Sequence, residues 1–83
     1  MPTLRELREE ATLTQSELAT QVGVSKMTVY SWERGESGPR PAHIRELAKA
    51  LGKSPQEIKD ALKATQARRG EEETATEMWR DVA

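Results

Sequence analysis

The 83-residue chain contains no cysteine and no phenylalanine, and its aromatic residues are two tryptophans and one tyrosine. Without cysteine it can form neither a disulfide framework nor a thiolate metal site. No apolar run approaches the roughly 18 residues needed to span a bilayer, and the charged residues 1–10 are unlike a signal peptide. We therefore expect a soluble, cytoplasmic protein with no membrane partner.

The sequence also lacks a strong excess of charge of one sign, because it has 13 basic and 14 acidic residues. The charge is nevertheless uneven along the chain. Residues 1–69 hold 12 basic and 9 acidic residues, a balance of +3, whereas residues 70–83 hold 1 basic and 5 acidic residues, a balance of −4. The sequence thus predicts one mildly basic domain over 1–69 and an acidic tail over 70–83.

No segment alternates as a strand would, and capping residues together with helical spacing of apolar residues predict an all-α fold. The predicted helices cover about 3–11, 15–22 and 25–34, a fourth begins at Ala42 or His43, and a fifth begins near Ser54. Capping boxes at Thr3 and Thr14 open the first two helices. The segment ESGPRPA between helices three and four contains two prolines and a glycine and is expected to be an exposed loop.

The tail has two interpretations. Its glutamates favour a flexible, solvated end, but Ala75, Met78, Trp79 and Val82 follow the i, i+3, i+4, i+7 spacing of a short sixth helix. Such an apolar stripe would pack on helix five or on a second copy of the chain.

The most informative segment runs from residue 15 to residue 35, where two short helices are joined by a tight glycine turn. That is the geometry of the DNA-reading helix-turn-helix motif. Ala19 is small enough for the helices to cross closely, Gly23 can take a positive φ, and Trp32 fills the wedge behind the second helix. The outward face of that helix has no structural task of its own. It comprises Met27, Ser31 and Arg34, flanked by Lys26, Thr28 and Tyr30.

The stretch TQSELATQVGVSKMTVYSWERG, continued by RPAHIRELAKALGKSPQEI, resembles the phage repressor and Cro type of helix-turn-helix regulators, the XRE family. The resemblance extends from about Leu4 to Ile58. It implies a five-helix lambda-repressor-like DNA-binding domain, with helix three in the major groove and helix two crossing the DNA backbone above it. It also implies a sequence-specific transcription regulator, most often a repressor, that binds a pseudo-palindromic operator as a homodimer.

The resemblance assigns roles to individual residues. Gln15 matches a glutamine that touches a phosphate and braces the first reading side chain, and Arg8 with Glu33 matches an ion pair between helices one and three. The alternative for that pair is an exposed contact that adds almost no stability. Positions that approach base edges or neighbouring phosphates are occupied by Ser25, Lys26, Met27, Thr28 and Ser31.

The reading positions lack the amides that bind adenine in the best-known members, so the target sequence stays open. Lys26 could donate to guanine and Met27 could press on a thymine methyl group. Lys26 and Arg34 could equally be solvated surface, and Tyr30 could contact a phosphate or nothing. Two further candidates for DNA binding follow helix three: Arg40, the basic residue of the loop, and His43, which lies near a phosphate or has no role.

The sequence is compatible with other functional classes besides a transcriptional repressor. An antitoxin would use the tail to bind a toxin and the helix-turn-helix to regulate its own operon, and a polymerase contact is a further protein partnership. A scaffold that binds proteins alone is disfavoured by Gln15 and the polar face of helix three. Helices this short enclose little volume for catalysis, and one histidine makes a poor metal site, so we expect no enzyme, cofactor or metal. Any dimer interface is expected on helix five and residues 70–83.

Overall fold

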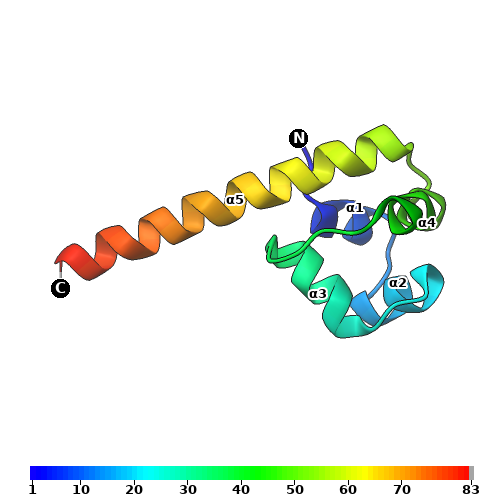
Figure 1. Ribbon diagram of the computed structural model, residues 1–83, viewed down its shortest axis with the longest axis horizontal. Coiled ribbons are helices and arrows are strands. Elements are labelled where there is room, and N and C mark those ends of the chain that lie inside the picture. Colours follow the sequence, from blue (N-terminus) through cyan, green and yellow to red (C-terminus); the bar gives the residue numbers. More distant parts are fainter. Residues whose placement is uncertain (83) are drawn as a thin grey trace.

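Five helices and no strand make up the part of the chain that the computed structural model describes, namely the backbone of residues 1–82 and the side chains of residues 1–68. The all-α prediction is confirmed. The helices are α1 (Leu4–Glu10), α2 (Gln15–Val22), α3 (Lys26–Arg34), α4 (Pro41–Leu51) and α5 (Pro55–Val82). The first four gather around the start of α5, whose C-terminal half projects beyond them (Figure 1). None of the described helices is long and apolar enough to cross a membrane.

Helices α1, α2, α3 and α5 begin where their capping residues predict. At α2, Thr14 Oγ1 accepts a hydrogen bond from Glu17 N at 3.1 Å, and Thr14 N donates to Glu17 Oε1 at 3.0 Å. The bond from Thr14 N to the carboxylate is the main cause that lowers the pKa of Glu17, because it stabilises the ionised form, and the Thr14 side chain lowers it further. At α3, Ser25 Oγ accepts from Thr28 N at 3.2 Å. Both helix starts are therefore set by local side chain–backbone bonds.

The helix ends differ in one instructive way. Gly23, Gly35 and Gly52 follow α2, α3 and α4 with positive φ, as a left-handed helix stop requires. The stop after α1 uses Thr12 instead, with φ 58°. Thr12 N donates to the carbonyl oxygen of Glu9, and Leu13 N to that of Arg8, so the hydrogen bonds of the stop are complete without glycine. A β-branched residue in this conformation is strained.

The hydrophobic core draws on all five helices. Trp32 of α3 is 3% exposed, and Leu4, Leu18, Leu47 and Ile58 are fully buried. The other buried apolar residues are Leu7, Ala19, Val22, Val29, Ala48, Leu51 and Ala61. Because α2 and α3 share this core with α1, α4 and α5, their relative placement follows from packing of the whole domain.

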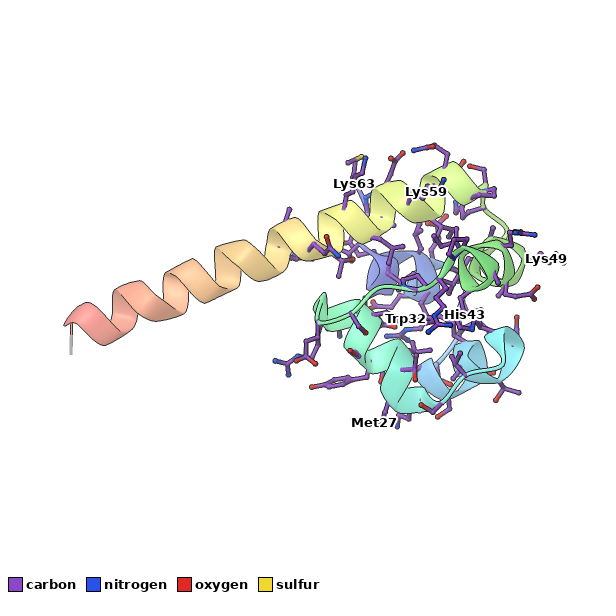
Figure 2. All side chains as sticks on the ribbon, in the orientation of Figure 1. Met27, Trp32, His43, Lys49, Lys59 and Lys63 are labelled. Atoms are coloured by element: carbon purple, nitrogen blue, oxygen red, sulfur yellow. The ribbon has the colours of Figure 1, made fainter. Side chains whose placement is uncertain are left out.

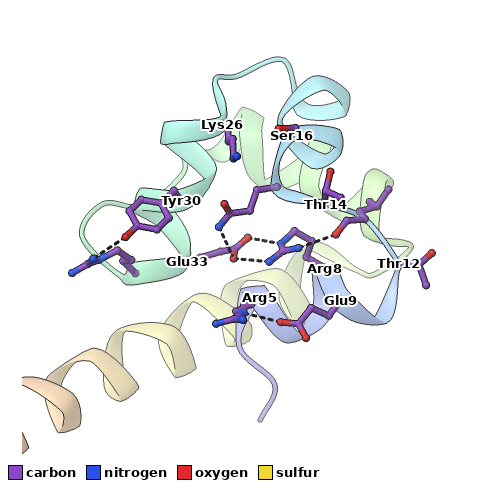
Figure 3. A pocket seen from close by; sticks show the side chains of 12 residues that line it. Arg5, Arg8, Glu9, Thr12, Thr14, Ser16, Lys26, Tyr30 and Glu33 are labelled. Atoms are coloured by element: carbon purple, nitrogen blue, oxygen red, sulfur yellow. Dashed lines mark hydrogen bonds and ion pairs between the residues drawn. The ribbon is translucent and has the colours of Figure 1, made fainter.

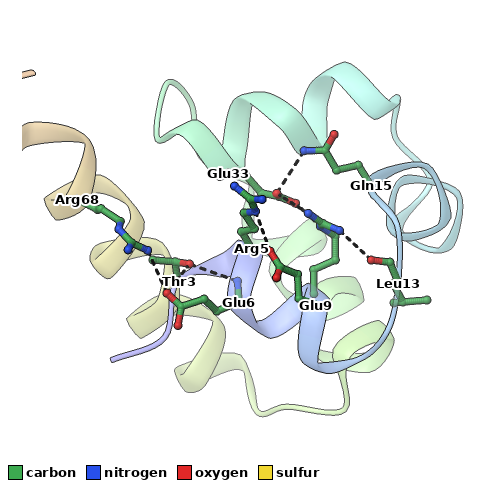
Figure 4. Close-up of polar contacts among 9 residues, drawn as sticks. Thr3, Arg5, Glu6, Glu9, Leu13, Gln15, Glu33 and Arg68 are labelled. Carbon is green, nitrogen blue, oxygen red and sulfur yellow. Dashed lines mark hydrogen bonds and ion pairs between the residues drawn. The ribbon is translucent and has the colours of Figure 1, made fainter. Parts of the chain in front are cut away.

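The N-terminus is joined to the middle of α5. Leu4 N donates to Thr65 Oγ1 at 3.1 Å. Arg68 Nη1 lies 3.1 Å from Glu6 Oε1, as Figure 4 shows. Thr65 is 4% exposed and also donates to the carbonyl oxygen of Ala61. These contacts attach α5 to α1 before α5 leaves the globule.

Two expected boundaries were wrong. Helix α4 begins at Pro41, not at Ala42 or His43, because proline fits the first turn of a helix, where its missing N–H costs nothing. Residues 70–82 extend α5 and do not form a separate sixth helix. Gly70 costs about 1 kcal/mol relative to alanine inside a helix, too little to end one that strong helix formers flank. The side chains of Ala75, Met78, Trp79 and Val82 lie outside the described residues.

Candidate nucleic-acid interface

Helices α2 and α3 meet through a three-residue connection formed by Gly23, Val24 and Ser25. Gly23 has φ 82°, and its N–H and that of Val24 both donate to the carbonyl oxygen of Ala19. Ala19 itself is 3% exposed, so the small side chain is buried at the helix crossing, as the sequence predicts. The two helices are thus joined by a short turn whose geometry depends on a left-handed residue.

The two faces of α3 have different surroundings. Val29 and Trp32 point into the core, whereas Met27 is 69% exposed and points away from the other helices (Figure 2). Lys26 and Tyr30 are also exposed. An exposed methionine beside a lysine and a tyrosine offers apolar contact, positive charge and a hydroxyl on one helix face.

The hydroxyl-bearing candidates of α3 are already engaged in the free protein. Ser25 and Thr28 share a hydrogen bond of 2.9 Å between their hydroxyls. Ser31 Oγ lies 2.8 Å from Ser37 Oγ, in the loop after the helix. The structure therefore brings Ser25 and Thr28 together at the start of α3 and ties Ser31 to the loop.

A shallow basin of about 730 Å³ lies beside this face, between α1, the start of α2 and α3 (Figure 3). Its carboxylates have cationic partners: Arg5 Nε lies 2.7 Å from Glu9 Oε1, and Arg8 pairs with Glu33. The basin is lined by Arg5, Arg8, Glu9, Thr12, Leu13, Thr14, Gln15, Ser16, Lys26, Tyr30, Glu33 and Arg34. Its four cations outnumber its two carboxylates, which suits a polyanion better than a cation.

A buried polar network underlies the basin. Arg8 donates from Nε to Glu33 Oε2 at 2.7 Å and from Nη2 to Glu33 Oε1 at 3.1 Å. The two side chains are 12% and 4% exposed, so the alternative of an exposed Arg8–Glu33 pair is wrong. Gln15 Nε2 also donates to Glu33 Oε1 at 3.3 Å, and Arg8 Nη1 to the carbonyl oxygen of Leu13 (Figure 4). Glu33 of α3 is thereby joined to both α1 and α2.

The C-terminal end of α3 carries a second polar cluster. Arg34 Nη1 donates to the Tyr30 hydroxyl at 2.9 Å, and Arg34 Nε lies 3.1 Å from Glu36 Oε1. The Arg34 guanidinium carbon also lies 5.5 Å from the centroid of the Tyr30 ring. Tyr30 and Arg34 are therefore in direct contact, as their i and i+4 spacing on a helix allows.

Two predicted site residues lie apart from this face. His43, on α4, packs against Trp32 with ring centroids 5.6 Å apart and is half-buried (Figure 2). Arg40 precedes the first turn of α4 and is exposed. Neither lines the basin. Among the described side chains, no group of three histidine, aspartate or glutamate residues is arranged to hold a metal ion.

Sequence reasoning did not single out Thr12 or Ser37. Thr12 lies between the end of α1 and the start of α2, so its positive φ could be suspected from the need for a sharp stop there. Ser37 bonds a residue six positions earlier, and no local pattern signals that contact.

These features define a class. Two short helices meet at a glycine turn within a five-helix domain, and the second helix is buried on one side and exposed on the other. This arrangement is a helix-turn-helix fold. The helix-turn-helix family profile matches residues 4–58. The chain belongs to this family, in agreement with its resemblance to phage repressor and Cro-type proteins.

Curated relatives agree with this assignment. An uncharacterized HTH-type transcriptional regulator of Methanothermobacter thermautotrophicus is 42% identical over 50 residues, which cover 60% of this chain and 72% of the relative. The transcriptional repressor RghR of Bacillus subtilis is 51% identical over 49 residues, 58% of this chain and 36% of RghR. The cryptic phage CTXphi repressor RstR of Vibrio cholerae is 39% identical over 49 residues, 59% of this chain and 44% of RstR. The matching region thus spans less than half the length of the two named repressors.

Proposed function

We propose that this protein is a sequence-specific double-stranded DNA-binding repressor that occupies a pseudo-palindromic operator as a homodimer. The observation that carries the proposal is the open face of α3, where Lys26, Met27 and Tyr30 are exposed beside a basin whose carboxylates are paired. The names of the relatives support regulation of transcription. Occupying an operator would block access of polymerase to a promoter.

In this proposal the N-terminal half of α3 reads bases, since a recognition helix contacts base edges with its first residues. Lys26 is placed to donate to guanine O6 or N7, and Met27 to cover a thymine methyl group. Phosphate contacts would flank these two residues and fix the register without carrying sequence information. The candidates for them are Gln15, Ser25, Thr28, Tyr30, Ser31, Arg34, Arg40 and His43.

One recognition helix reads only a few base pairs, so selectivity requires a second copy. The spacing of Ala75, Met78, Trp79 and Val82 favours an apolar stripe on the part of α5 that projects from the globule (Figure 1). We place the homodimer contact there. In a dimer on B-form DNA the two recognition helices would lie about 34 Å apart, one helical turn of the duplex.

Selection of bound sequences from a random duplex pool, at two salt concentrations, tests the whole proposal. We expect enrichment of an inverted repeat whose half-sites are separated by about one helical turn. Raising the salt should weaken binding steeply, because phosphate contacts release counterions. A pool that shows no enrichment at either salt concentration would rule out sequence-specific reading. An enriched site without two-fold symmetry would rule out the dimer.

A further inference from the structure

A carboxylate lies beside a cation at the C-terminal end of α3, on the surface that we propose faces DNA. Glu36 Oε1 is 3.1 Å from Arg34 Nε, with the two side chains 43% and 55% exposed. Arg34 also donates to the Tyr30 hydroxyl at 2.9 Å, so its guanidinium contacts both Tyr30 and Glu36. Arg34 is thus engaged by neighbours before any DNA arrives.

The backbone holds Glu36 in this place. Gly35 turns the chain with φ 75°, and Glu36 N donates to the carbonyl oxygen of Ser31 at 3.1 Å. The next residue, Ser37, bonds the Ser31 hydroxyl at 2.8 Å. Because these bonds fold the start of the loop back on α3, little ordering is needed to bring the carboxylate to Arg34.

The fold gives this carboxylate no structural task comparable with that of Glu33, which is buried and joins three helices. Glu36 is exposed and lies outside the helices. A negative charge here opposes binding of a polyanion in two ways. It repels phosphates directly, and it occupies a cation that could otherwise neutralise one.

We propose that Glu36 limits the sequence-independent affinity of this protein for DNA by competing with backbone phosphates for Arg34. This inference rests on the proposed function and adds to it a residue that sets how strongly the phosphate backbone is held. While Glu36 is paired with Arg34, it neutralises charge that a phosphate would otherwise use. The loop residue therefore weakens the part of binding that is common to all DNA sequences.

The test is a double-mutant cycle with Glu36→Gln and Arg34→Gln, measured as dissociation constants on a labelled random-sequence duplex across a range of salt. Glu36→Gln should tighten binding about two- to fivefold, the scale of an exposed ion pair. The plot of log affinity against log salt should steepen by about one unit, as one added phosphate contact requires. In the Arg34→Gln background the gain should disappear.

Glu46→Gln is the matched control, because it removes the same charge from an exposed pair with Lys49 on α4, away from α3. It should change random-duplex binding less than Glu36→Gln does. Thermal unfolding midpoints of all variants confirm that each is folded. If Glu36→Gln tightens binding no more than Glu46→Gln, or equally with and without Arg34, the competition is disproved while DNA binding stands. If the unsubstituted chain binds no duplex, the proposed function and this inference both fail.

Discussion

At the scale of the residue, Thr12 shows where local conformation departs from what the side chain prefers. It adopts φ 58° at the end of α1, in the place that glycine occupies after α2, α3 and α4. The backbone N–H groups of Thr12 and Leu13 both bond carbonyl oxygens of α1, and these bonds require a left-handed residue at position 12.

We therefore expect Thr12→Gly to raise the free energy of unfolding by up to about 1 kcal/mol, as relief of the left-handed strain exceeds the added chain entropy. Thr20→Gly is the control, because Thr20 lies inside α2 and the same change there should destabilise the protein by about 0.3 kcal/mol. Urea denaturation of both variants measures the difference. Destabilisation by Thr12→Gly would mean that the threonine side chain contributes more than its backbone costs.

Met27 carries the clearest residue-scale prediction for function. Its side chain is 69% exposed on α3 and contributes nothing to the core. Met27→Ala should leave stability nearly unchanged and alter base preference at one or two operator positions, where a good contact discriminates by about 1–3 kcal/mol. Competition binding against single-base variants of the selected site measures this. An unchanged ranking of those variants would contradict a reading role for Met27.

At the scale of the elements, one buried carboxylate joins α3 to both α1 and α2. Glu33 accepts two bonds from Arg8 of α1 and one from Gln15 of α2. Removing one partner of a buried pair leaves the other charge without compensation, which typically costs more than the pair contributes when intact. Gln15 would also lose the bond that now fixes its amide.

Glu33→Gln should accordingly lower the free energy of unfolding by about 3 kcal/mol, a large share of what a domain of this size has. Glu9→Gln removes a carboxylate from an exposed pair with Arg5 and should cost less than about 1 kcal/mol. Chemical denaturation of the two variants under the same conditions gives the comparison. Equal losses would show that burial of the Arg8–Glu33 pair is unimportant for stability.

At the scale of the whole molecule, α5 has two parts with different surroundings. Ile58, Ala61 and Thr65 are buried against the other helices, and Arg68 still reaches Glu6. Beyond these residues the helix projects from the globule, as Figure 1 shows. Among the side chains that the structure describes, the buried residues of α5 therefore all lie at or before Thr65.

Deleting residues 71–83 should leave the domain folded but reduce self-association, and operator affinity should fall more than stability does. Sedimentation equilibrium measures self-association, operator titration measures affinity, and the thermal unfolding midpoint measures stability. Gly70→Pro is the matched variant, because it interrupts α5 while keeping the apolar residues in the chain. A truncated protein that dimerises fully would place the interface elsewhere.

The sequence alone predicted the helix-turn-helix and nearly every helix start, because these depend on short-range chemistry. The helix caps contact only residues within one turn, as Thr14, Ser25, Gly23 and Gly35 do. The inward positions of Val29 and Trp32 follow from helical spacing. The length of α5 was missed for the complementary reason. A lone glycine weakens a helix by a small amount, and whether the helix continues depends on the sum over its neighbours.

Tertiary structure decided what depends on distant parts of the chain meeting. Burial of Arg8 with Glu33 and packing of His43 on Trp32 arise from the angles at which separate helices come together. Local propensity determines which residues are helical. Only close packing of the shared core determines which side chains of separate helices touch, because it leaves each helix a single orientation.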